Sequence, residues 1–168
     1  MSGTGYFDQI KRSFADVPVT DEGVDTVAFL EACEDLVKLF EKSKTLESMV
    51  ENEKTEKKKD ATQGLLWLTR GLHFTYEGLR LSQKNPGEEL SESFTKGYET
   101  TLKQYHSFVV KPIFGLAMKA CPYRADLFEK LGPKEKVDVE LERWLAGLEK
   151  IVGQIEKFYE KGNYGKGL

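Results

Sequence analysis

The stretch GLLWLTRGLHF, residues 64–74, places a tryptophan, an arginine and two glycines within eight positions. On a helix, spacings of three and four residues bring side chains onto one face. One face then holds Leu65, Leu68, Leu72, Tyr76 and Leu79, and a second face holds Trp67, Gly71, Phe74 and Gly78. Glycine in a helix interior costs about 1 kcal/mol relative to alanine. The second face therefore indicates either close packing of another helix or a slender ligand lying along a groove.

Helical periodicity continues on both sides of this stretch. We expect helices over residues 26–40, 44–59, 60–83, 89–121, 124–132 and 133 to about 158. Asp60 and Gln63 have the spacing of a capping box, and Pro112 is expected to bend its helix. The last helix carries an apolar stripe of Val137, Leu141, Trp144, Leu148, Ile151, Ile155 and Phe158. No segment alternates convincingly at period two, so the sequence predicts an all-α fold.

The length, charge and motifs of the chain limit the classes of function that it can have. A chain of 168 residues with a net charge of −3 predicts one domain, residues 1–168, that does not bind nucleic acid. Within it we expect a core over about residues 6–161 and a loose tail at 162–168. No apolar run approaches the roughly 20 residues that span a bilayer, and no secretory signal is visible. Metal-binding and catalytic motifs are absent, so neither an enzyme, a metal site nor a cofactor is expected.

The helix around His106 changes from polar to apolar side chains along its length, as the helix around Trp67 does. In LKQYHSFVVKPIFGLAMKACPY, residues 102–123, the histidine begins a stripe that becomes apolar toward the C-terminal end. That stripe consists of His106, Val110, Ile113, Phe114 and Ala117. Two helices that run from polar to apolar in this way suit an amphiphile with a sugar-like head and a long tail.

Three segments, in this order, resemble the glycolipid transfer protein family. They are GLLWLTRGLHF at 64–74, LKQYHSFVVKPIF at 102–114 and ACPYRADLF at 120–128. The N-terminal segments YFDQIKRSFADVPV and FLEACEDL are similar to its fungal heterokaryon-incompatibility branch. The resemblance extends from about Tyr6 to Phe158, and the pairing of Trp67 with His106 is its most specific part.

The resemblance implies a two-layer all-α sandwich that carries one glycosphingolipid without catalysing a reaction. Trp67 would stack on the first sugar, His106 would bond the ceramide amide region, and Tyr164 would lie near the headgroup. The positions implied near the hydrocarbon tails are Phe29, Leu30, Cys33, Phe74, Val110 and Phe114. Phe108 stands where the family often has an aromatic residue that touches the membrane. We therefore expect a cytosolic monomer that needs no cofactor and binds membrane surfaces transiently.

The chain departs from the family pattern in one place. The family carries Asp-x-x-x-Asn-x-x-Lys on the helix after the FLEA segment, whereas here residues 39–42 lead directly toward the tryptophan helix. One helix is therefore expected to be missing near Lys42–Lys44, together with charge-assisted bonds that would set sugar specificity. Ser48, Asn52 and Thr55 have the spacing of the motif without its acid or its lysine.

Several functions are compatible with this departure. The chain is a truncated transfer protein that transfers nothing, a loose lipid binder with altered headgroup preference, or a helical lipid-sensing or protein-interaction module. Relatives that carry ceramide 1-phosphate have a basic residue where Trp67 stands, which favours a neutral glycolipid over a phosphorylated one. Intermembrane transfer or binding of glycosphingolipids is the function that the sequence favours.

Overall fold

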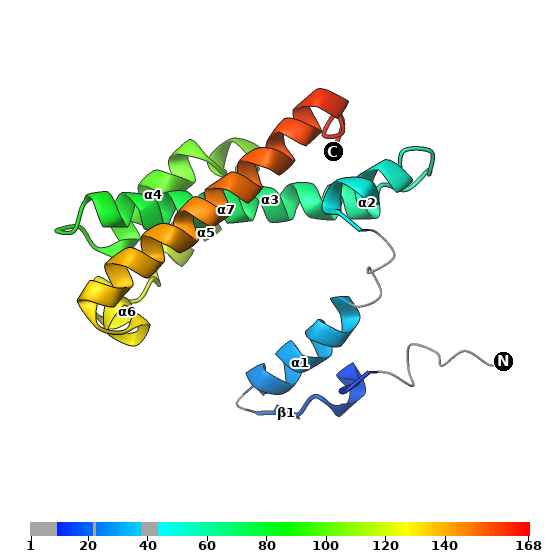
Figure 1. Cartoon of the computed structure of the whole chain (residues 1–168). Helices are drawn as coiled ribbons and strands as arrows, with labels where there is room; N and C mark the ends of the chain where they lie inside the picture. The colour runs from blue at the N-terminus through cyan, green and yellow to red at the C-terminus, as the bar shows by residue number, and fades with distance from the viewer. Residues whose placement is uncertain (1–9, 22, 38–43) are drawn as a thin grey trace. The chain divides into compact units, whose positions relative to one another are not determined.

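The computed structural model describes residues 10–21, 23–37 and 44–168 (Figure 1). The chain divides into two units, Met1–Met49 and Val50–Leu168, and each is described by itself. The described segments are mostly helical, which confirms the prediction of an all-α fold. Lys42 and Ser43, where we expect a helix to be missing, and Phe40, at the end of the first expected helix, lie outside the described residues.

The smaller unit is built on helix α1, Thr26–Val37. Asp25 caps this helix, because its Oδ1 accepts a hydrogen bond from the backbone N–H of Ala28 at 2.8 Å. Before α1 come a 3₁₀ turn, η2 (Phe14–Asp16), and a hairpin of two short strands, β1 (Val19–Thr20) and β2 (Gly23–Val24). Period-two alternation does not reveal the hairpin, since two residues are too few to alternate.

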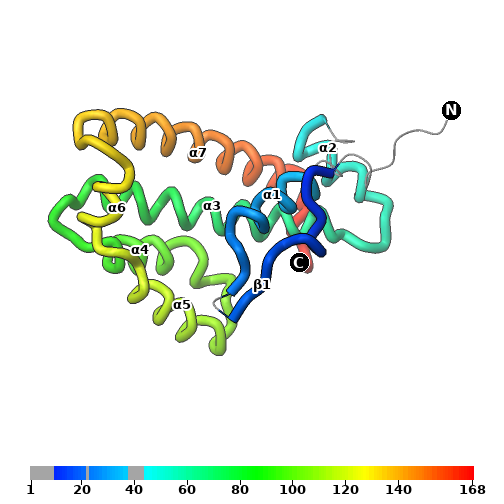
Figure 2. Tube along the Cα trace, turned by 90° about the horizontal axis from the view of Figure 1, so that it is seen from below, coloured from blue at the N-terminus to red at the C-terminus, as the bar shows by residue number. Residues whose placement is uncertain are grey.

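The larger unit consists of helices that run back and forth along one another. They are α3 (Asp60–Lys84), α4 (Leu90–Thr100), α5 (Val110–Lys119), α6 (Arg124–Leu131) and α7 (Lys134–Gly162), with α2 (Leu46–Asn52) crossing the boundary between the units. Figure 2 shows α3 between α7 and α4, with α5 beyond α4. The long helix α3, which carries the stretch GLLWLTRGLHF, is therefore the centre of this unit.

The helix expected at 44–59 ends earlier than predicted, and the residue after it binds the first backbone N–H groups of α3. Helix α2 stops at Asn52, and the next residue, Glu53, turns its carboxylate toward the start of α3. There it accepts hydrogen bonds from the backbone N–H groups of Ala61 at 2.9 Å and Thr62 at 2.8 Å. The predicted capping box is wrong, because Glu53 supplies the acceptor that the first turn of α3 needs.

The expected helix at 89–121 is interrupted between Thr100 and Val110. A 3₁₀ turn, η4 (Lys103–Tyr105), fills part of the interruption and places His106 in an extended conformation directly after it. Pro112 lies in the first turn of α5, so the expectation that it bends a longer helix is wrong. The first N–H groups of a helix have no partner within it, and proline therefore costs little there.

Helices α3 and α4 cross at two glycines. A Cβ on Gly97 would lie 3.1 Å from the backbone nitrogen of Gly78, and a Cβ on Gly78 would lie 2.7 Å from Cδ1 of Phe94. At Gly71, by contrast, an added Cβ would meet nothing within 4 Å. Of the two glycines on the Trp67 face, Gly78 is explained by close helix packing, whereas Gly71 borders open space.

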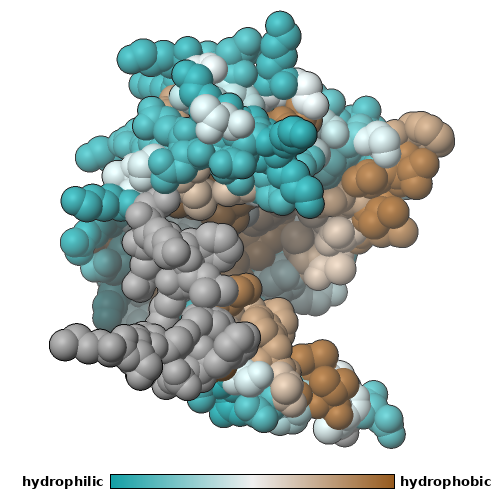
Figure 3. All heavy atoms as spheres, turned by 90° about the vertical axis from the view of Figure 1, so that its right-hand side faces the viewer, coloured by the Kyte–Doolittle hydropathy of each residue, from teal (hydrophilic) through white to brown (hydrophobic). Residues whose placement is uncertain are grey.

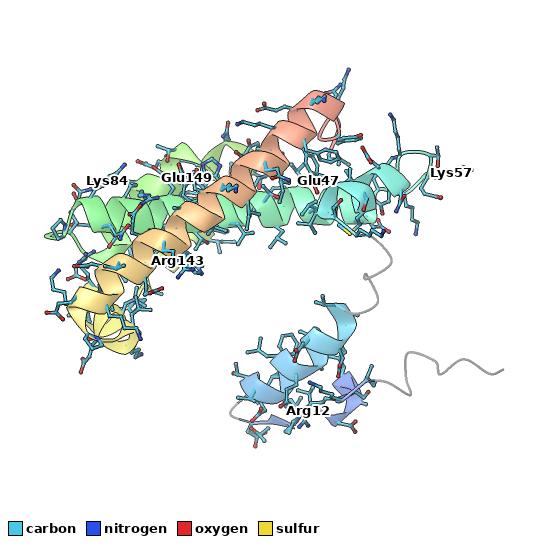
Figure 4. All side chains as sticks on the ribbon, viewed as in Figure 1. Arg12, Glu47, Lys57, Lys84, Arg143 and Glu149 are labelled. Atoms are coloured by element: carbon cyan, nitrogen blue, oxygen red, sulfur yellow. The ribbon has the colours of Figure 1, made fainter. Side chains whose placement is uncertain are left out.

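Polar side chains fix α3 against α7 at three places along their length. The hydroxyl of Tyr159 donates to the backbone oxygen of Thr62 at 2.6 Å, and burial raises the pKa of Tyr159 to about 12. Nδ1 of His73 lies 2.6 Å from Oε1 of Glu156. Farther along, Arg80 binds two carboxylates on α7, those of Glu142 and Glu149; Figure 4 labels Glu149.

The buried face of α7 differs from the predicted stripe. Its buried residues are Val137, Leu145, Val152, Ile155 and Tyr159. Trp144 and Ile151 of the predicted stripe are each 53% exposed, and Leu68 on the leucine face of α3 is 56% exposed, so none of the three is buried. Much of the predicted stripe instead lines a groove of about 710 Å³ between α3, α6 and α7, with walls that include Leu79, Leu127 and Leu131.

Candidate functional site

The fold brings Trp67 and His106 together from elements far apart in the sequence. Trp67 lies on α3, and His106 follows the 3₁₀ turn after α4. Their rings are stacked, with centroids 6.1 Å apart and planes inclined by 16°. Trp67 is 38% exposed, so part of its ring is accessible to a ligand.

His106 is surrounded by further aromatic rings. Its centroid lies 4.4 Å from that of Phe114 on α5 and 5.6 Å from that of Tyr98 on α4. Tyr98 and Phe114 stack on each other at 5.2 Å with an angle of 12°. Four rings from three helices and one turn therefore form a continuous cluster, which we call the aromatic cluster: Trp67, Tyr98, His106 and Phe114.

The surroundings of His106 favour its neutral form. Burial lowers its pKa, and the positive charge of Lys111 acts in the same direction. The Tyr98 hydroxyl lies 3.2 Å from Nδ1 of His106, and burial raises the pKa of Tyr98. When this hydroxyl donates to Nδ1, the imidazole proton resides on Nε2. That N–H is then the group that His106 can offer to a ligand acceptor.

Two further expected tail residues lie in the larger unit. Phe74 packs edge-on against Phe94 at 5.5 Å and against Tyr98 at 6.4 Å, which joins it to the aromatic cluster. Val110 is half-buried at the first turn of α5, the helix that carries Phe114. Apolar side chains from α3 and α5 thus extend from the same cluster that holds Trp67.

The other three expected tail residues lie on α1 in the smaller unit. Phe29 is 44% exposed and contacts Phe14 edge-on with ring centroids 6.0 Å apart. Leu30 is 59% exposed, and Cys33 is a half-buried free thiol. The residues buried on α1 are instead Ala28, Ala32 and Asp35. This helix therefore presents its larger apolar side chains at the surface of its unit.

The expected membrane residue, Phe108, is 85% exposed, more than any other large hydrophobic residue that the structure describes. Its neighbours on and before α5 are also exposed: Val109, Ile113 and Leu116 at 57%, 59% and 68%. Figure 3 shows hydrophobic surface gathered at one side of the larger unit. Within residues 10–21, 23–37 and 44–168, no helix has the length and apolar character needed to cross a bilayer.

Tyr164 lies apart from the aromatic cluster. Its ring stacks on Phe158 of α7 with centroids 4.8 Å apart, and it meets Tyr159 edge-on at 6.2 Å. Asn163, with φ of 52°, turns the chain back at the end of α7 and allows this packing. In the described part of the chain, no ring contact joins Tyr164 to Trp67 or His106.

The sequence analysis assigns no role to three residues that lie at the candidate site, Tyr98, Arg70 and Tyr105. The Tyr98 hydroxyl lies 3.2 Å from Nδ1 of His106. The guanidinium carbon of Arg70 lies 3.7 Å from the ring centroid of Tyr105 and 4.8 Å from that of Trp67. Two signals were available, since Arg70 follows Trp67 by one helical turn and Tyr105 directly precedes His106. For Tyr98 no sequence signal existed, because its role depends on how α4 packs. No group of metal ligands occurs among the described residues.

Comparison with known proteins identifies the family to which this chain is similar. The protein-family model for glycolipid transfer protein matches residues 41–133. A glycolipid transfer protein of Aureobasidium melanogenum is 42% identical, and the alignment covers 93% of each chain. The human pleckstrin homology domain-containing family A member 8 is 26% identical over 92% of this chain and 38% of its own length.

The fold is also that of a solved family structure. The crystal structure of HET-C2, a fungal glycolipid transfer protein, matches with a TM-score of 0.62 and 38% identity. The match covers 93% of this chain and 97% of that chain, which confirms the expected type of all-α fold.

One comparison bears on the missing helix. The alignment with the Aureobasidium protein runs over 187 positions, whereas 93% of this chain is only about 156 residues. About 30 positions of that relative therefore have no counterpart here, which is enough for one helix with its loops.

Since the family model covers more than half of the chain and the fungal relative matches nearly all of it, this chain belongs to the glycolipid transfer protein family.

Proposed function

We propose that this protein binds one glycosphingolipid and transfers it between membranes without catalysing a reaction. The observation that carries the proposal is the stacked pair of Trp67 and His106, which joins α3 to the turn before α5. Membership of the family supports lipid binding and transfer in general. The headgroup contacts, the tail contacts and the membrane contact below are our proposals.

In this proposal the aromatic cluster is the mouth of the binding site. The exposed part of the Trp67 ring stacks on the C–H face of the first sugar. The Nε2–H group of His106 donates to the ceramide amide region. The lipid tails extend past three apolar side chains, Phe114 of the cluster and its neighbours Phe74 and Val110. The roles of Phe29, Leu30 and Cys33 near the tails, and of Tyr164 near the headgroup, stay predictions of the sequence.

Energetics explain why such a protein needs no chemical step. Exposing a methylene group to water costs about 0.8 kcal/mol. A ceramide with roughly 30 methylenes therefore faces on the order of 20 kcal/mol when it leaves a membrane unassisted. A dry apolar site offsets most of this cost, so that exchange proceeds without ATP or a covalent intermediate. We infer a cytosolic monomer that docks on a membrane through Phe108, exchanges its lipid and dissociates.

The test measures transfer of a fluorescent galactosylceramide between vesicles. Trp67→Ala should lower the initial rate about five- to thirtyfold, because an aromatic platform for the sugar is worth on the order of 1–2 kcal/mol. Trp144→Ala is the matched control, since this second tryptophan is 53% exposed on α7 and lines the separate groove. It should leave the rate unchanged.

Other outcomes would replace the proposal. If Trp67→Ala transfers lipid as fast as the natural chain, stacking on Trp67 is not the basis of binding. If the natural chain itself transfers no glycolipid, the truncated or interaction-module hypotheses take its place.

A further inference from the structure

Tyr98 lies at the centre of the aromatic cluster and is only 5% exposed. Helix α4, which carries it, lies between α3 and α5 (Figure 2). The Tyr98 ring meets Phe74 of α3 edge-on at 6.4 Å and stacks on Phe114 of α5 at 5.2 Å. Because rings on both neighbouring helices hold it, the position of its hydroxyl is fixed.

The chain between Tyr98 and His106 is also fixed. Tyr98 lies in the last turn of α4, next to Gly97, whose close approach to Gly78 sets the place of α4 against α3. After this helix the Thr101 hydroxyl donates to the backbone oxygen of Gly97 at 2.7 Å, and the turn η4 leads to His106. The Tyr98 hydroxyl thereby lies 3.2 Å from Nδ1 of His106.

Only one arrangement of protons satisfies both groups of this pair. Burial raises the pKa of the Tyr98 phenol and lowers that of His106, so the phenol is protonated and the imidazole neutral at neutral pH. Among the described residues, Nδ1 is the acceptor within bonding distance of this hydroxyl. If Nδ1 carried the imidazole proton, the phenol proton would be buried without an acceptor, which is unfavourable. The phenol therefore donates to Nδ1, and the imidazole proton lies on Nε2.

Ring contacts alone do not orient the imidazole. Trp67 and Phe114 contact His106 with centroids 6.1 and 4.4 Å away, and they would contact it in much the same way after the ring turns over by half a rotation. That rotation places a carbon where Nδ1 lies and breaks the bond to Tyr98. The Tyr98 hydroxyl is therefore the group that distinguishes the two orientations.

We propose that Tyr98 is a positioning residue, which fixes the orientation of His106 and keeps the imidazole proton on Nε2 as a donor for the ligand. A donor that is already oriented binds an acceptor better, because less freedom is lost when the ligand arrives. The inference rests on the proposed function, because it concerns the group that His106 offers to a bound lipid. Tyr98 acts in it through His106 alone.

The first test locates the proton of His106 in the lipid-free chain by ¹⁵N NMR of the ring nitrogens. The sequence contains two histidines, so the signals that disappear in His106→Gln belong to His106. At about pH 7.5 the natural chain should show a protonated Nε2 and an unprotonated Nδ1. Tyr98→Phe keeps the ring and removes the hydroxyl, so its signals should move toward a mixture of the two tautomers.

The second test measures extraction of galactosylceramide from phosphatidylcholine vesicles into a soluble complex. Tyr98→Phe should lower extraction about fivefold, which corresponds to the loss of one hydrogen bond. In a His106→Gln background the same substitution should change extraction less than about twofold, because Nδ1 is then absent. Glutamine keeps an N–H donor and Trp67 is unchanged, so this background should still extract lipid.

The second tyrosine–histidine pair of the larger unit provides the matched control. Tyr76 stacks on His73 with centroids 5.0 Å apart, but Nδ1 of His73 lies beside Glu156. Tyr76→Phe should therefore leave both the His106 signals and the extraction unchanged. Thermal unfolding of each variant checks that it is folded.

The outcomes distinguish this inference from the proposed function. A proton on Nδ1 in the natural chain, or identical His106 signals in Tyr98→Phe, shows that the hydroxyl does not set the tautomer. An equal loss of extraction from Tyr98→Phe in both backgrounds shows that Tyr98 acts through packing. Each of these results overturns the inference and leaves the proposed function standing. A natural chain that extracts no galactosylceramide overturns the proposed function and, with it, the role of Tyr98 in binding.

Discussion

His106 shows at the scale of one residue how burial becomes pH dependence. Its pKa in the folded protein lies below the unfolded value of about 6.5, because burial and the charge of Lys111 disfavour the imidazolium. Protonation then favours the unfolded chain. The stability linked to His106 is therefore present above about pH 6.5 and is lost as the pH falls toward the lowered pKa.

We predict that His106→Gln reduces the decrease in unfolding midpoint between about pH 7.5 and 5.5, as followed by circular dichroism. Glutamine does not titrate, so the contribution of this site to the pH dependence disappears. His73→Gln is the control, because it removes the other histidine of the sequence, which lies outside the aromatic cluster, and the decrease should persist. The same decrease in His106→Gln as in the natural chain would contradict the prediction.

The proximity of Trp67 and His106 in the candidate site was predictable, because the chemistry of each is unusual for its position. Trp67 and His106 each begin an otherwise apolar stripe, and helical spacing alone makes this pattern visible. Tyr98 gives no such signal, because helical periodicity shows which residues share a face and not which ring of another helix lies opposite. The partners of His106 are set by the packing of α4 and α5, which no local pattern encodes.

At the scale of elements, the crossing of α3 and α4 yields a paired prediction. Gly71→Ala and Gly78→Ala each gain about 1 kcal/mol of helix propensity. At Gly78 the new Cβ would collide with the ring of Phe94 at 2.7 Å, whereas at Gly71 it would meet nothing within 4 Å. We expect Gly71→Ala to stabilise the protein by up to about 1 kcal/mol and Gly78→Ala to destabilise it by about 1–2 kcal/mol. Urea unfolding measures both, and equal effects at the two sites would refute the steric explanation.

The sequence predicted which segments form helices better than it predicted where these helices end and which faces they bury. The helices at 60–83 and 124–132 are found within one residue of their expected bounds. The end of α2 was missed because Glu53 bonds to a helix that begins seven residues later, and the break before α5 was missed because Pro112 is compatible with a helix start. In the first case a contact with another helix decided where α2 ends, and in the second case the local pattern allowed two interpretations.

At the scale of the whole molecule, lipid transfer depends on reaching a membrane. Burying a phenylalanine side chain contributes about 1.5–3 kcal/mol, and Phe108 is 85% exposed. Phe108→Ser should therefore weaken sedimentation with vesicles about tenfold and slow transfer by a similar factor. Val139→Ser is the control, since Val139 is 66% exposed on α7, away from α5. If both variants sediment like the natural chain, Phe108 is not the docking residue.

The fork that Arg80 makes with Glu142 and Glu149 has a consequence for how the larger unit deforms. Because these two carboxylates lie two helical turns apart, sliding α7 along α3 by even one turn would break both bonds together. Tyr159 and His73 pin the same pair of helices nearer the other end. In contrast, Phe114 of α5 meets its neighbours through ring contacts, tilted against His106 and stacked on Tyr98, and a sideways shift of these rings breaks no hydrogen bond. We therefore expect a displacement of helices that admits a ligand to cost less at α5 than at α7.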